Sequence, residues 1–190
     1  MYKKIVLSVF LILSIFTAVL KGQTTGNSAI DIILAGYSAK MFSSEPVSDK
    51  DIDLILKCGI KAPSARNSQP WRFTVVKDNV LTGEIVPNIT PGNVLIIVSG
   101  MESGQQGINV DFDCALATEN MYIAALSLDL GARIYGSPVN NINTTKKEVL
   151  AIPEGYRAVT VLRIGHIDKS VDAVSAASTR KKLEEVVIFK

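Results

Sequence analysis

Two stretches of the chain place apolar residues at helical spacing behind a capping residue. Ser28 follows a polar leader and is placed to cap a short first helix. Ser48 and Asp51 have the spacing of a capping box, in which side chains satisfy the backbone N–H groups that begin a helix. The apolar residues that follow recur every three or four positions (Ile52, Ile55, Leu56, Ile60). We therefore expect a helix from this box to Pro63.

A third and longer helix is predicted from near Asp111 to Gly131. Its apolar residues occupy nearly every face, which is typical of a helix that is buried all round. Short apolar runs rich in β-branched residues predict four strands at residues 73–76, 94–98, 157–164 and 186–189. Strands with helices between and around them predict a three-layer α+β domain.

The first 22 residues have the pattern of an export signal. Lys3 and Lys4 precede an apolar run over residues 5–20, and Gly22 is a small residue before a polar one. Because the run is shorter than the roughly 20 residues that span a bilayer, we expect cleavage that leaves residues 23–190 as the mature chain. This chain would be periplasmic or secreted from a bacterium. The alternative is an uncleaved signal that anchors the protein to the membrane at its N-terminus.

Composition and charge narrow the function classes. A length of 190 residues predicts one domain, and 47% hydrophobic with 20% charged residues excludes a disordered chain and a protein of many membrane spans. Residues 1–22 hold three lysines and no acidic residue, so the mature chain has 17 basic and 18 acidic residues and its net charge changes from +2 to −1. We therefore expect no nucleic-acid partner and, after signal cleavage, no membrane contact.

The cysteine and histidine content argues against a metal site and against a Ser-His-Asp catalytic triad. Cys58 and Cys114 stand apart in helical patterns, and both are predicted to be buried small apolar residues, although a disulfide between them stays open. His166 is the single histidine and follows a predicted strand, where an ordinary strand-end residue is expected. We expect no metal site.

Three polar segments are candidates for binding a ligand. They are residues 38–40, the loop at residues 63–71, and the basic residues 180–182. The loop is the most informative, because a helix ends at Pro63 and delivers hydroxyl, amide and guanidinium groups in front of a strand led by Trp71. Such groups suit a planar or anionic ligand. The alternative is a capped turn that satisfies only its own backbone.

Residues 62–73, with the sequence APSARNSQPWRF, resemble the hallmark segment of the FMN-dependent nitroreductase family. Further similar segments follow in the expected order and extend the resemblance over nearly all of residues 30–190 (38–42, 113–131, 152–156 with 164–165, and 180–187). The resemblance implies a nitroreductase-like three-layer fold with a mixed central sheet flanked by helices. Residues 23–190 would then form one FMN-binding domain.

The resemblance also implies a homodimer with FMN in a cleft between the subunits. Electrons or hydride would pass from NAD(P)H or another donor through the flavin to a flat acceptor such as a nitroaromatic or a quinone. The flavin performs this chemistry, so no residue is expected to act as a general acid or base. The alternative is a catalytically weak or inactive exported dimer that binds flavin or another small ligand. A third possibility is a structural protein of the cell envelope.

The family motifs assign roles to individual residues. Ser38 and Arg180 are expected to bind the FMN phosphate, while Lys40 lies along the ribityl chain toward the N1/O2 edge of the flavin. Tyr135 and Gly136 fall where the family offers a backbone N–H near flavin N5. The loop of the neighbouring subunit is expected to line the other side of the cofactor (Pro63, Ser64, Ala65, Asn67, Gln69), and Arg66 is a hypothetical contact for the acceptor or the nicotinamide.

The chain departs from the family pattern at a few positions. Gly36 stands where the family usually has Arg, and Ser178 stands where many members have a second basic residue. Lys181 or Lys182 is expected to compensate for these missing phosphate contacts. Residues 77–93 are short and contain prolines where larger members have helices, which predicts a more open and less selective site.

Overall fold

The computed structural model describes residues 26–103, 107–171 and 179–190, so the predicted export signal lies outside the described residues. The chain divides into a short N-terminal unit up to Gly36 and a main unit from Tyr37 to Lys190. The first unit contains helix α2 (Ser28–Ala35). Its cap is Asn27 rather than the expected Ser28, because the Asn27 side chain accepts hydrogen bonds from the backbone N–H groups of Ala29 and Ile30.

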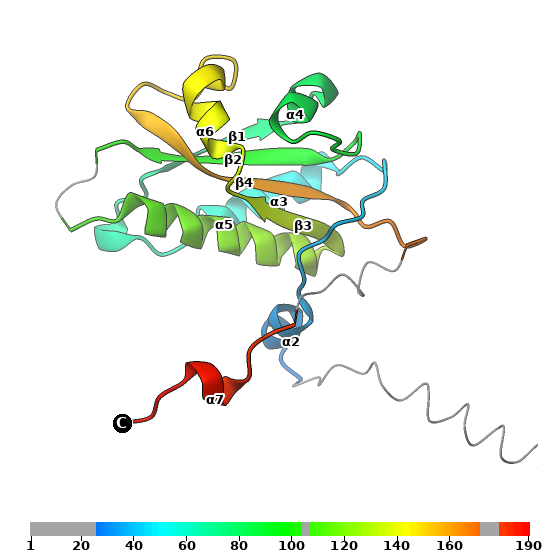
Figure 1. The fold of residues 1–190 in the computed structure, drawn as a ribbon, viewed down its shortest axis with the longest axis vertical. Helices are drawn as coiled ribbons and strands as arrows, with labels where there is room; N and C mark the ends of the chain where they lie inside the picture. Colours follow the sequence, from blue (N-terminus) through cyan, green and yellow to red (C-terminus); the bar gives the residue numbers. More distant parts are fainter. Residues whose placement is uncertain (1–25, 104–106, 172–178) are drawn as a thin grey trace, which may run out of the picture. The chain divides into compact units, whose positions relative to one another are not determined.

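The main unit is built on a four-stranded sheet with the order β1-β2-β4-β3 (Figure 1). The strands are β1 (Trp71–Val76), β2 (Val94–Met101), β3 (Leu130–Tyr135) and β4 (Tyr156–His166). Every neighbouring pair runs antiparallel, so within the described residues the sheet is not mixed as expected. The α+β fold itself is confirmed.

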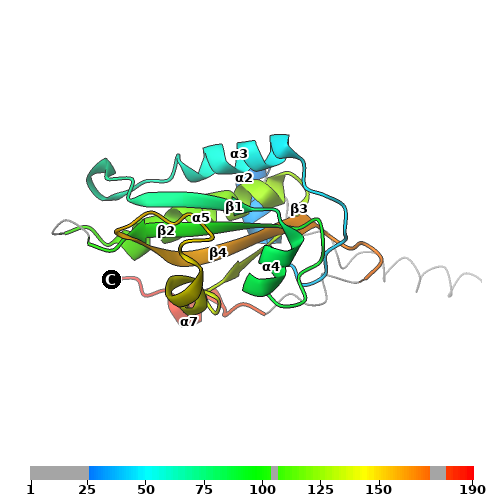
Figure 2. The same ribbon diagram turned by 90° about the horizontal axis from the view of Figure 1, so that it is seen from above.

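Helices cover both faces of this sheet, which confirms the three layers (Figures 1 and 2). One face packs on α3 (Asp49–Gly59) and α5 (Val110–Ser127). The other face packs beneath α4 (Asn79–Ile85), α6 (Val139–Asn141) and a short π-helix η2 (Ile142–Lys146). Alternate residues of β2 point to the two faces, so Ile96 joins one hydrophobic core and Leu95 joins the other.

Helix α3 begins as predicted and ends four residues early. The hydroxyl of Ser48 accepts from the backbone N–H of Asp51 at 3.1 Å and donates to its carboxylate at 2.7 Å, which confirms the capping box. The helix ends at Gly59 and a turn leads to Pro63. Cys58 near this end is exposed, contrary to expectation, whereas Cys114 is buried, and both thiols are free.

Helix α5 ends at Ser127 and is not buried all round. Asp129 has a φ of 58°, and this left-handed residue turns the chain into β3, a strand that the apolar pattern had merged with the helix. One side of α5 is exposed, with Phe112 61% accessible. No helix in the part of the chain that the structure describes is long and apolar enough to cross a membrane.

The C-terminal segment does not form the predicted strand over residues 186–189. A short helix α7 (Leu183–Val186) takes its place, and the residues after it belong to no strand. A strand needs a neighbour for its backbone hydrogen bonds, and the described chain pairs none with this run. Ile188 and Phe189 are left 83% and 90% exposed.

Candidate functional site

The segment around Ser38 and Lys40 runs along the edge strand β3. The backbone N–H of Ala39 donates to the carbonyl of Ala132 at 3.0 Å, which fixes the segment against the strand. Ala39 is buried while Ser38 and Lys40 are exposed, as expected for an extended segment whose alternate side chains share a face. A hydroxyl and an ammonium group therefore project from the same side.

This contact depends on the absence of a side chain at Gly131. A Cβ atom there would lie 3.0 Å from the Cβ of Ala39 and 3.0 Å from a ring carbon of Phe42. Such contacts are tighter than nine in ten real Cβ contacts, so a side chain here would push the segment a few tenths of an ångström away from β3. At the other end of the strand, a Cβ at Gly136 would meet no atom within 4 Å, so the space beside it is open.

Arg180 lies within electrostatic reach of the same region. Burial is the main cause that raises the pKa of Tyr122 on α5, and the charge of Glu119 raises it further. The charge of Arg180 lowers the pKa of this phenol, and Tyr37, which precedes Ser38, raises it. Arg180 and the segment that begins at Tyr37 thus both face the second half of α5, where the resemblance places them together.

Lys181 and Lys182 are exposed and follow Arg180 directly. Ser178, the other departure from the family pattern, lies outside the described residues.

The loop after Pro63 has an unusual backbone. Arg66, Asn67 and Gln69 have φ values of 54°, 54° and 45°, in the left-handed region that L-residues rarely adopt. The hydroxyl of Ser64 accepts from the backbone N–H of Gln69 at 3.0 Å, and the Gln69 amide donates to the Asn67 side chain at 3.2 Å. The polar residues of the loop thus satisfy one another in part, as the capped-turn alternative supposed.

A buried carboxylate holds this loop from below. Asp113 in the first turn of α5 is 1% exposed, and both of its oxygens accept from the backbone N–H of Ala65 at 3.2 Å. The hydroxyl of Ser68 donates to the same carboxylate at 3.4 Å. Sequence reasoning placed Asp113 in a helix and missed this role, although an acidic residue in a first helical turn is a usual signal for backbone capping.

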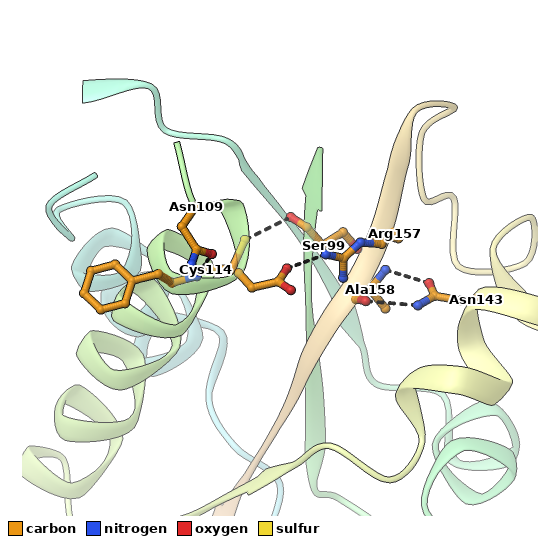
Figure 3. A network of polar contacts seen from close by, with 8 residues as sticks. Ser99, Asn109, Cys114, Asn143, Arg157 and Ala158 are labelled. Atoms are coloured by element: carbon orange, nitrogen blue, oxygen red, sulfur yellow. Dashed lines mark hydrogen bonds and ion pairs between the residues drawn. The ribbon is translucent and has the colours of Figure 1, made fainter. Parts of the chain in front are cut away.

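A second network surrounds the start of α5 (Figure 3). Asp111 forms an ion pair with Arg157 of β4 at 2.6 Å, and the thiol of Cys114 donates to the Ser99 carbonyl at 3.9 Å. Burial, followed by the charges of Asp111 and Asp113, raises the pKa of Cys114 to about 12. The thiol therefore stays protonated at neutral pH and is no nucleophile.

On the other side of β4, the Asn143 side chain exchanges two hydrogen bonds with the backbone of Ala158, at 3.0 and 2.7 Å (Figure 3).

The two halves of the candidate site lie at opposite ends of α5 (Figure 1). The loop is bound at Asp113 in the first turn, whereas Ala39 is bound at Ala132, beyond the last turn. At 1.5 Å per residue, the helix spans about 21 Å between Asp113 and Ser127. One chain therefore does not bring the predicted loop residues together with Ser38 and Lys40.

The donor set at the segment end fits a flavin mononucleotide. A phosphate needs fixed cations and hydroxyl donors, and Ser38, Lys40 and Arg180 are of these kinds. The open space beside Gly136 admits a ring system close to the backbone. The donors for the other face of such a ring are at the opposite end of the same chain, in the loop over Asp113.

Comparisons with known proteins identify the family of this chain. A model of the nitroreductase family matches residues 33–89. The "Putative NADH dehydrogenase/NAD(P)H nitroreductase" of Archaeoglobus fulgidus is 31% identical over 147 residues, which cover 72% of this chain and 84% of that protein.

Solved structures are similar as well. A "putative nitroreductase in complex with fmn" from Desulfovibrio desulfuricans has a TM-score of 0.74 and 28% identity, over 86% of this chain and 97% of that one. A nitroreductase with bound FMN from Bacteroides fragilis has the same fold, with a TM-score of 0.73 and 20% identity over 86% of this chain and 100% of that one.

Proposed function

This chain belongs to the nitroreductase family, and from that premise we propose that it is an FMN-dependent oxidoreductase that takes electrons from NAD(P)H. FMN-bound neighbours of the same fold and relatives named as NAD(P)H nitroreductases support the assignment. The observation that carries it is the donor set of Ser38, Lys40 and Arg180, which lies along the strand that ends at the open space of Gly136.

When bound, FMN supplies the two-electron chemistry, and the protein supplies position and charge. Ser38 and Arg180 hold the phosphate, and Lys40 places a positive charge on the ribityl side of the site. The Tyr135–Gly136 turn lets the backbone approach the ring. Arg66 is exposed on its loop and is the residue proposed to contact the acceptor or the nicotinamide.

We propose that the active form is a homodimer. If two copies of α5 pack antiparallel about a two-fold axis, the loop end of one chain meets the segment end of the other. Each of the two sites would then combine Ser38, Lys40 and Arg180 of one chain with Ser64, Ala65 and Asn67 of its partner.

Exposed apolar residues support this arrangement. Phe112 lies 61% exposed on α5, and Ile188 and Phe189 are 83% and 90% exposed at the C-terminus. A second copy would remove this surface from water and would offer the C-terminal run a strand edge with which to pair. Size-exclusion chromatography with light scattering tests the proposal, and a monomer at micromolar concentration contradicts it.

The acceptor is proposed to be a small flat molecule such as a nitroaromatic or a quinone. A second candidate is a flavin-binding dimer with little turnover, favoured by Gly36, which leaves the early motif without its usual arginine. The two differ in one measurement, because an oxidoreductase consumes many equivalents of NAD(P)H and acceptor per bound flavin, whereas a flavin-binding dimer consumes few.

We also propose that the protein is exported after cleavage of residues 1–22. The intact mass of the protein recovered from a periplasmic extract tests this, and the expected N-terminus is Gln23. A full-length mass in the membrane fraction would instead indicate the anchored form.

The visible absorption spectrum tests the function directly. The purified protein is recorded as isolated, after FMN addition and desalting, and then with NADPH or NADH under anaerobic conditions. Retained flavin bands that bleach with the nicotinamide are the expected result. A colourless protein that retains no FMN contradicts both flavin hypotheses.

A further inference from the structure

A buried arginine lies behind the segment end of the site. Arg163 of β4 is 6% exposed, and no carboxylate pairs with it in the described part of the chain. Its Nε donates to the Asn93 side-chain oxygen at 2.7 Å, and its Nη2 donates to the Thr90 hydroxyl at 3.1 Å. Its guanidinium lies 3.9 Å from the centre of the Phe42 ring.

The position of Arg163 does not require a charge for packing. Val161, the preceding residue of β4 on the same face of the sheet, is fully buried and apolar. Burial is the main cause that lowers the pKa of Arg163, and the charge of Arg133, its register partner on β3, lowers it as well. A buried cation without a counter-ion costs stability that an apolar side chain of similar length would not.

The contacts of Arg163 reach both parts of the site that one chain supplies. On one side it meets Phe42, and the Asn93 amide that it binds donates in turn to the Ser43 carbonyl at 3.1 Å. Phe42 and Ser43 continue the segment that carries Ser38 and Lys40. On the other side lies Tyr135, which precedes Gly136 and stands two residues along β3 from Arg133, the register partner of Arg163, so both side chains are on the same face of the sheet. The phenol of Tyr135 raises the pKa of Arg163 against the effect of burial.

Glycine makes room for this network. A Cβ at Gly165 would lie 2.6 Å from the amide nitrogen of Asn93, so the strand could carry no other residue there without moving that amide. Arg133 stacks its guanidinium 5.0 Å from the ring centre of Tyr135, on the residue that Arg163 also holds. The arrangement fixes Tyr135 relative to the segment over residues 38–43.

We propose that Arg163 is a positioning residue that holds the Ser38–Lys40 segment and the Tyr135–Gly136 turn at a fixed separation before the flavin binds. The inference deepens the proposed function and rests on it. Without the guanidinium, Asn93, Thr90 and Tyr135 lose a shared partner, and the two parts of the site move independently. A ligand that contacts both must then order them, which lowers its affinity.

The test compares Arg163→Met with Arg157→Met in the full-length protein. Arg157 lies on the same strand, but its side chain forms an exposed ion pair with Asp111. Titration of the apo-protein, followed by quenching of flavin fluorescence, is expected to give FMN binding about tenfold weaker for Arg163→Met, as when a competent site is populated one tenth of the time. Arg157→Met is expected to bind as the unmodified protein does.

Riboflavin, which lacks the phosphate of FMN, distinguishes a positioning role of Arg163 from attraction between its positive charge and the phosphate. If Arg163 is a positioning residue, Arg163→Met lowers the affinities for riboflavin and for FMN by the same factor, because both ligands contact the two parts of the site. A loss confined to FMN overturns the proposal, since it would show only the pull of a positive charge on the phosphate. Unchanged FMN affinity with a lowered apo-protein melting temperature also overturns it.

Amide hydrogen exchange of the apo-protein keeps the inference separate from the proposed function. Arg163→Met is expected to raise exchange together at residues 38–43 and at residues 135–136, and Arg157→Met at neither. If the unmodified protein binds no flavin, the proposed function fails while this coupling is still measured. Unchanged exchange in both segments contradicts the inference whatever the flavin result.

Discussion

A buried charge lies beneath each half of the site, Asp113 of α5 under the loop and Arg163 of β4 under the segment, but the two charges are used differently. Asp113 accepts from a backbone N–H and a hydroxyl of the loop above it. Arg163 donates to neutral side chains and stacks on a ring. The loop has several residues at positive φ and needs an external acceptor to hold it, whereas the segment at residues 38–43 is extended and already bonded to β3.

The comparison indicates that Asp113 maintains the conformation of the loop above it. Arg163 instead sets the distance between the Ser38–Lys40 segment and the Tyr135–Gly136 turn, each of which keeps its own conformation. Loss of the Asp113 carboxylate should therefore lower the free energy of unfolding, whereas loss of the Arg163 guanidinium should chiefly lower the affinity for the ligand. The changes below test this difference, beginning with the largest expected effect.

Asp113→Ala is expected to lower the free energy of unfolding by about 2–3 kcal/mol, since it leaves a buried N–H without its charged acceptor beneath a strained loop. The protein should also lose FMN on desalting. Urea denaturation and the ratio of flavin to protein measure the two effects.

Asp111→Ala is the matched control, because Asp111 occupies the same helical turn but forms an exposed ion pair, worth at most about 1 kcal/mol. Asp113→Asn, which keeps one oxygen acceptor, should fall between the two. Equal unfolding free energies for Asp113→Ala and Asp111→Ala would show that the carboxylate does not hold the loop.

Gly131→Ala tests the contact that fixes the segment to β3. Its methyl group would lie 3.0 Å from Ala39 and Phe42 and 2.9 Å from Ile167, so overpacking should cost about 1–3 kcal/mol. Gly136→Ala is the control just past the other end of β3, where no atom lies within 4 Å. It should leave the melting temperature of the apo-protein unchanged and weaken FMN binding, because the methyl group enters the proposed flavin space. A stability loss at Gly136 as large as that at Gly131 would contradict this assignment of the open space.

The loop end also has a distinctive response to alkaline pH. The folded pKa of Cys114 is raised to about 12 from 9.0, so folding favours the protonated thiol. This stabilisation is complete below pH 9 and is lost as the pH rises from 9 toward 12, at a rate of at most about 1.4 kcal/mol per pH unit. Cys114→Ala should flatten that part of the stability profile.

A thiol reagent gives an independent reading of the same environment. Exposed Cys58 should react in the native protein, whereas Cys114 should react only after unfolding. Two reactive thiols per native chain would contradict the burial of Cys114.

The elements that sequence predicts correctly depend on neighbours close in the chain. The capping box at Ser48 and the apolar run of β2 are local patterns, and both are found. Strand β3 was missed because a single left-handed residue, Asp129, separates two apolar elements without glycine or proline. The prediction of a mixed sheet was wrong for the described residues, where every neighbouring pair of strands runs antiparallel.

The missed site residues have partners far away in the sequence. Asp113 binds Ala65 across 48 positions, and Arg163 binds Asn93 across 70. In the sequence, Asp113 is one acidic residue in a helix and Arg163 one polar residue in a strand. The polar loop and the Ser38–Lys40 segment could be identified because their residue types suit an anion, but what holds them could not.

The double variant Asp113→Asn with Arg163→Met tests the comparison itself. Its expected effect is the smallest, because it is measured as the deviation of its unfolding free energy from the sum of the two single changes. Asp113 of α5 and Arg163 of β4 share no hydrogen-bond partner, so their effects on the unfolding of the apo-protein should add to within about 0.5 kcal/mol. FMN binding should behave otherwise, because in the proposed dimer one flavin contacts the loop of one chain and the segment of the other. A loss of FMN affinity different from the product of the two single losses is therefore expected alongside additive stabilities. Additivity in both measurements would mean that no common ligand joins the two ends.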